Sequence, residues 1–105
     1  MNDYLSDFNA FVSELVNYHI RMNKEISIAY LAEKMGVSNS FVQKAIYTPK
    51  EKHFNLKHIF LIAQAMNLSV EDLIPSRENY KLITNKDLPK EDWQIFINEL
   101  RKENQ

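Results

Sequence analysis

The sequence predicts an all-α fold, in which a five-helix bundle is followed by a C-terminal amphipathic helix. Apolar residues recur at intervals of three and four in successive segments, which places them on one face of a helix. Residues that start or end helices (serine, asparagine, proline and the single glycine) stand between these segments. A chain of 105 residues is long enough for one small domain with a modest core.

The segment 27–47 has the pattern of a short helix, a tight turn and a second helix. Ser27 is placed to cap the first helix, whose apolar face follows at positions 28, 31, 32 and 35. Gly36 comes directly after that face, and glycine adopts the left-handed conformation that ends many helices. Ser38 is placed to cap the second helix, whose apolar positions are Val42, Ala45 and Ile46.

Two stretches resemble the lambda-repressor-like (Cro-type, or xenobiotic-response-element) DNA-binding domains: LAEKMGVSNSFVQKAI, and further along NLKHIFLIAQAMNLSVEDLI. The resemblance covers about residues 8–75. It implies a bundle of five helices. The third helix would enter the major groove of DNA, and the helix before it would cross the backbone.

The flanking helices are predicted from their own apolar stripes. Residues 3–23 are expected to form one amphipathic helix, in which Leu5 and Phe8 pack either on the bundle or on a second copy of the chain. Asn55 is placed to cap a helix that ends at Asn67. A short helix follows over residues 69–75 and is stopped by Pro75.

We expect residues 1–75 to be the helix-turn-helix domain, residues 76–88 a polar linker and residues 89–105 a last helix. The apolar stripe of that helix is too large to leave in water. It either covers the domain's own core or is buried against a partner. The linker before it favours self-association, with a dimerisation surface formed by Trp93, Phe96, Ile97 and Leu100.

The net charge of −1 argues against a general binder of polyanions, but the charges are unevenly distributed. Residues 1–18 contain three acids and no lysine or arginine, whereas residues 19–58 contain seven lysines and arginines against three acids. The positive segment coincides with the helix-turn-helix pattern. Proteins that bind nucleic acid concentrate positive charge on one face in this way.

The resemblance implies, position by position, which residues contact bases. They lie on the outward side of the helix that Ser38 is placed to cap, and they are Asn39, Ser40, Gln43 and Lys44. Lysine donates to guanine O6 and N7, and asparagine or glutamine pairs with adenine N6 and N7. Phe41 either meets a thymine methyl group or shields the turn. The implied phosphate contacts are Lys34, Ser38, Lys50 and Lys52, although the loop 50–53 equally fits a solvated linker.

The chain departs from the family's pattern around this surface. Ile28 stands where a glutamine often contacts phosphate. The residues at 45–48 are AIYT where the pattern I-E-x-G is common, so that the acid and the glycine are both missing. These changes bear on affinity and docking, whereas the buried positions that define the fold are kept.

One recognition helix contacts only a few base pairs, and helix-turn-helix proteins usually dimerise on half-sites about one DNA turn apart. We therefore expect a homodimeric transcriptional repressor that binds double-stranded operator DNA. The alternative is a protein-interaction module (an antirepressor, adaptor or antitoxin) that has weakened or lost DNA binding. A protein antagonist is a further candidate partner.

Other classes of function are disfavoured by what the sequence lacks. The absence of cysteine excludes disulfides, thiol catalysis and the common zinc clusters. There is no glycine-rich phosphate loop, metal-ligand spacing or nucleophile motif, so we expect no enzyme, no cofactor and no metal. No apolar run approaches the roughly 20 residues of a membrane span, and the acidic N-terminal residues lack the basic flank of a signal peptide. The expected location is the cytoplasm.

Overall fold

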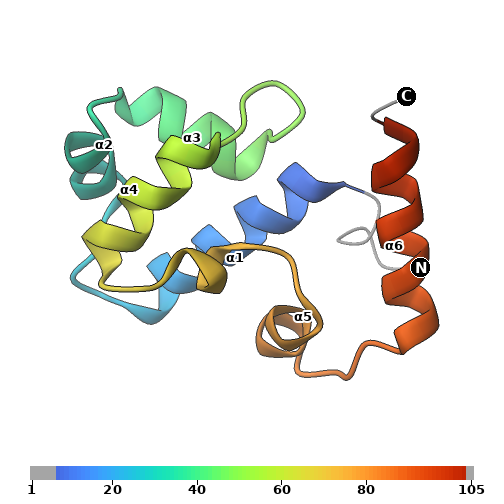
Figure 1. Ribbon diagram of the computed structural model, residues 1–105. Coiled ribbons are helices and arrows are strands. Elements are labelled where there is room, and N and C mark those ends of the chain that lie inside the picture. Colours follow the sequence, from blue (N-terminus) through green and yellow to red (C-terminus); the bar gives the residue numbers. More distant parts are fainter. Residues whose placement is uncertain (1–6, 104–105) are drawn as a thin grey trace.

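The computed structural model describes residues 7–103, with side chains up to residue 102. Within this range the chain forms helices and no strands, which confirms the predicted all-α class. Figure 1 shows α2, α3 and α4 on one side of the molecule, α5 and α6 on the other, and α1 between them. In chain order the elements are α1 (Phe8–Met22), α2 (Ile28–Met35), α3 (Asn39–Tyr47), α4 (Leu56–Met66), the 3₁₀-helix η2 (Val70–Leu73), α5 (Arg77–Thr84) and α6 (Lys90–Glu103).

The predicted helix caps are present. Ser27 Oγ accepts the Tyr30 N–H at the start of α2, and Asn55 Oδ1 accepts the N–H of the third residue of α4 at 2.9 Å. Gly36 ends α2 with φ 71°, and Asn67 ends α4 with φ 57°. The left-handed residue at each of these positions ends the helix and redirects the chain that follows.

The core consists of two apolar clusters that share α1. The first lies among α1, α2, α3, α4 and η2, and the second lies among α1, α5 and α6. The first contains the buried residues Val12, Val16, Leu31, Ala32, Met35, Val42, Ala45, Ile46, Phe54, Ile59, Ile62, Ala63, Met66 and Leu73. The second contains Phe11, Leu15, Tyr80, Leu88 and Phe96.

The start of α1 differs from the sequence prediction. Asp7 has an extended backbone and caps the helix, since its carboxylate accepts the N–H groups of Asn9 and Ala10. The helix therefore begins at Phe8 instead of residue 3. Leu5, one of the apolar positions predicted on this helix, lies outside the described residues.

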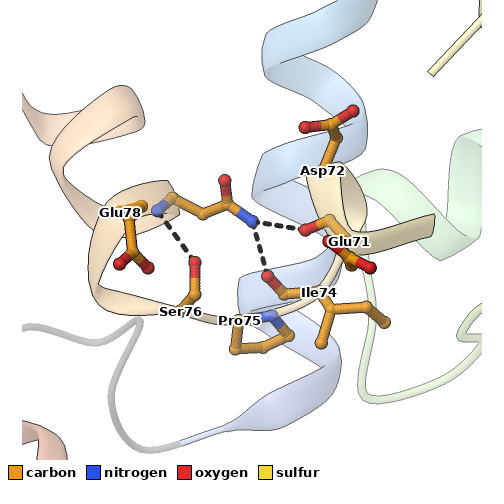
Figure 2. Close-up of a pocket in the computed structure, with 7 residues that line it drawn as sticks. Glu71, Asp72, Ile74, Pro75, Ser76 and Glu78 are labelled. Carbon is orange, nitrogen blue, oxygen red and sulfur yellow. Dashed lines mark hydrogen bonds between the residues drawn. The ribbon is translucent and has the colours of Figure 1, made fainter. Parts of the chain in front are cut away.

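The segment predicted as a polar linker contains a helix that the sequence analysis did not predict, because residues 77–84 form α5. Asn79 is buried, and its side-chain amide donates to the carbonyl oxygens of Glu71 and Ile74, at 2.9 and 2.6 Å. Figure 2 shows these two carbonyls together with Ser76, whose Oγ accepts the Asn79 N–H and caps α5. These bonds tie α5 to the end of η2, so the segment is part of the packed structure.

Helix α6 covers the chain's own core. Phe96 is 1% exposed, and its ring lies 6.1 Å from that of Phe11 on α1. Trp93 stacks on Phe96 at 5.2 Å, and Leu100 packs against the same cluster. The sequence allowed the apolar stripe on this helix either to cover the domain's own core or to be buried against a partner. The structure places Phe96 in the core of its own chain. Self-association through the rest of the stripe stays a prediction.

We expect Phe96→Ala to lower the free energy of unfolding by about 3–5 kcal/mol, because it leaves a cavity in the second cluster. Ile95→Ala, on the neighbouring and 40% exposed position, is the matched control and should change stability by less than about 1 kcal/mol. Urea unfolding followed by circular dichroism measures both. Equal effects of the two substitutions would contradict the packing of α6 on α1.

Candidate nucleic-acid interface

Helix α3 has one buried face and one exposed polar face. Val42 and Ala45 are completely buried, and Ile46 is nearly so. The four side chains predicted to contact bases, Asn39, Ser40, Gln43 and Lys44, are all exposed. The structure therefore brings these four predicted residues together on one short helix, with their side chains in solvent.

The turn before α3 is short and well bonded. The Val37 N–H donates to the Ala32 carbonyl at 3.0 Å, and the Gly36 N–H donates to the Glu33 carbonyl at 3.2 Å, so the last turn of α2 is closed at Gly36. Ser38 Oγ then accepts the Phe41 N–H at 3.0 Å. Ser38, which the sequence suggested as a phosphate contact, is exposed and also serves as the cap of α3.

Phe41 is partly buried and packs against the first apolar cluster, which fits the shielding of the turn, one of the two roles that the sequence allowed. Its ring lies 4.9 Å from the His58 ring and 6.2 Å, edge-on, from the Phe54 ring. Phe54 is buried at the end of the loop that joins α3 to α4. The three rings fasten the first turn of α3 to the start of α4.

His58 has a structural role that the sequence analysis missed. It is the third residue of α4, and its Nδ1 accepts the Asn55 N–H at 3.2 Å, which completes a capping box. This bond requires the unprotonated ring, because a protonated nitrogen cannot accept. Burial lowers the pKa of His58 below its ordinary value of about 6.5, and the charge of Lys57 lowers it further. The spacing of Asn55 and His58 was the available signal, although capping boxes usually carry Glu or Gln at this position.

The predicted phosphate-binding lysines are exposed but belong to two different parts of the bundle. Lys34 is on α2, with its Nζ 5.5 Å from the centre of the Tyr30 ring. Lys50 and Lys52 are in the loop between α3 and α4. The ion pairs within residues 7–102 involve other cations, Lys81 with Asp87 and Lys102 with Glu99. No carboxylate of residues 7–102 therefore forms an ion pair with Lys34, Lys50 or Lys52.

The described part of the chain offers little support for other kinds of site. Residues 7–103 bring together no three His, Asp or Glu side chains that could hold a metal ion. None of the helices in that range has the length and apolar character needed to cross a membrane. The pocket between η2 and α5 is lined by the carboxylates of Glu71, Asp72 and Glu78 (Figure 2), a poor surface for a polyanion.

Comparison of the chain with protein-family models, with curated proteins and with solved structures found no match.

The stability of the fold should decrease below about pH 6.5, because two histidines are held unprotonated. Burial lowers the pKa of His19, partly opposed by Asp72, and its Nε2 is buried without a hydrogen-bond partner. With folded pKa values below the unfolded value, the unfolded chain binds more protons in the interval between them. The stabilisation is complete above the unfolded pKa and is lost as the pH falls through the folded pKa.

Urea unfolding at a series of pH values measures this dependence. His58→Gln should weaken it, since glutamine at the third helical position keeps an acceptor for the capping box and does not titrate. His53→Gln, on the exposed loop, is the matched control. If His58→Gln and the parent lose stability equally on acidification, the capping box is not the element that titrates.

Proposed function

We propose that this protein is a sequence-specific regulator of transcription that binds double-stranded DNA through α3. The observation that carries the proposal is the exposed polar face of α3, formed by Asn39, Ser40, Gln43 and Lys44 on a helix whose opposite face is buried. A helix of this kind, projecting from a bundle after a tight turn, fits the major groove of B-DNA.

Some of the exposed side chains suit hydrogen bonds to base edges, and others suit contacts with phosphates. Lys44 donates to guanine O6 and N7, and Asn39 and Gln43 pair with adenine. Lys50 and Lys52 lie in the loop directly after α3 and carry charges free of ion pairs within residues 7–102, so they suit the adjacent phosphates. Lys34 and Ser38 are the phosphate contacts proposed on the other side of the turn.

Lys44→Ala should reduce the preference for a specific duplex over a scrambled one by about tenfold, the loss of one good base contact. The first duplex to test is the DNA that precedes the protein's own coding sequence, with affinity measured by fluorescence anisotropy over a range of salt concentrations. Lys50→Ala should weaken binding to both duplexes and reduce the salt slope by about one. Lys86→Ala, an exposed lysine between α5 and α6, is the matched control.

Two results would count against DNA binding. The first is a parent protein that binds neither duplex at low salt. The second is a set of variants in which Lys44→Ala and Lys86→Ala weaken binding equally, since a general charge effect would then explain the affinity.

We propose further that the protein acts as a homodimeric repressor, because one helix contacts too few base pairs to select a site. Phe96 is used in the core of its own chain. The side chains of the α6 stripe that remain partly exposed are Trp93, Ile97 and Leu100. Among the described residues Ile97 belongs to neither apolar cluster, so the pairing of two copies would use this edge of the helix.

Ile97→Asp should shift the protein toward monomers and weaken binding to a two-half-site duplex, while its effect on a single half-site should be small. Sedimentation velocity measures the association state. Asn98→Asp, which adds the same charge at an exposed position of α6, is the control. A parent protein that is monomeric at concentrations where it binds DNA would remove the α6 dimer from the proposal.

A second candidate function is a protein-interaction module, and one observation favours it. Leu56 and Phe60 are four positions apart on one face of α4 and are 71% and 50% exposed, which places two neighbouring large apolar side chains in solvent. The net charge of −1 points the same way. Absence of DNA binding together with capture of a protein partner that depends on Phe60 would favour this function over transcriptional regulation.

A further inference from the structure

A serine in the middle of α1 contacts the backbone of α3. Ser13 is 1% exposed and lies among the apolar side chains of the core. Its Oγ donates to the carbonyl oxygen of Ala45 at 2.5 Å, across 32 positions of sequence. Serine in a helix commonly bonds to a carbonyl of its own preceding turn, and here the hydroxyl instead reaches a different helix.

The Ala45 carbonyl needs this donor because of the residue four positions later. In a continuing α-helix it would accept the N–H of residue 49. Residue 49 is proline, which has no N–H. Ala45 is completely buried, so water does not replace the missing donor. The Ser13 hydroxyl therefore satisfies a carbonyl that the sequence of the following loop leaves without a helical partner.

The neighbouring carbonyl, that of Lys44, is held by Thr48. It accepts both the Thr48 N–H at 2.7 Å and the Thr48 hydroxyl at 2.9 Å. Two consecutive carbonyls in the last turn of α3 are thus fixed, one from α1 and one from the residue that ends the helix. Ala45 directly follows Lys44 in the chain and is buried in the core. Fixing these two carbonyls therefore fixes the backbone from which the Lys44 side chain leaves the helix.

We propose that Ser13 is a positioning residue for DNA recognition: its hydrogen bond to Ala45 holds the last turn of α3 on α1 and so fixes the direction of the Lys44 side chain. The proposal rests on the DNA-binding function proposed above. A serine that only stabilised the fold would affect the amount of folded protein. A positioning residue affects selectivity between duplexes in protein that is fully folded.

Ser13→Ala should lower the ratio of affinities for the specific and scrambled duplexes by about five- to tenfold, comparable to the loss of one base contact. Binding to the scrambled duplex, which depends on phosphate contacts, should change less than about twofold. The Thr48 amide should exchange with solvent about tenfold faster relative to the amides of α2. Ser76→Ala removes a serine hydrogen bond at the start of α5 and is the matched control, with neither effect expected.

Pro49→Ala offers a rescue that depends on the proposed geometry. Alanine at this position restores an N–H, which reaches the Ala45 carbonyl if α3 extends by a residue. The double variant Ser13→Ala/Pro49→Ala should therefore regain most of the selectivity and the slow exchange of Thr48. If Ser13→Ala does not fold, Ser13→Cys keeps the packing with a weaker donor and should show the same changes at smaller amplitude.

The outcomes separate the two proposals. Selectivity and Thr48 exchange unchanged in folded Ser13→Ala or Ser13→Cys overturn the positioning role. Lost selectivity that Pro49→Ala does not restore also overturns it, because the loss then does not arise from the Ala45 carbonyl. A parent protein that binds no DNA selectively refutes the function itself, and unchanged exchange at Thr48 then shows that Ser13 does not hold the turn either.

Discussion

Helix α1 joins the two apolar clusters, because side chains that are neighbours on this helix belong to different clusters. Val12 and Val16 pack among α2, α3, α4 and η2, whereas Phe11 and Leu15 pack against α5 and α6. Positions that differ by one residue are about 100° apart around a helix, so the two pairs form one wide apolar face. The helices of both clusters therefore pack on one surface of α1, and the buried Ser13 lies beside the edge of that surface.

The candidate DNA-binding surface is held from its buried side. Apolar packing seats α3, and the rings of Phe41, Phe54 and His58 fasten its first turn to α4. Hydrogen bonds from Ser13 and Thr48 hold its last turn. None of these groups needs to contact a ligand, which leaves the exposed face of α3 free to vary in chemistry without disturbing the fold. This separation suits a helix that has to present polar side chains in a fixed direction.

Local patterns predicted the helices up to residue 75 and their caps at Ser27, Ser38 and Asn55, since capping and apolar spacing act within a few residues. Helix α5 was missed because its packing involves residues outside the segment, such as Phe11 on α1, whose ring lies beside that of Tyr80. The sequence could not decide between core and partner for Phe96, because an apolar stripe looks the same in both cases. The candidate base contacts were predictable as outward positions of one helix, whereas Ser13 required knowledge of which carbonyl lies across the core.

The sharing of α1 between two clusters has a consequence for biosynthesis. Chains leave the ribosome with the N-terminal end first. The partners of Val12 and Val16 on α2–α4 emerge well before α6, so the first cluster can assemble while Phe11 and Leu15 are still uncovered. Until α6 has been made, the nascent chain carries an apolar strip along an otherwise assembled bundle. A chaperone would bind the nascent chain at this strip, and a chain terminated before α6 would be prone to aggregate through it.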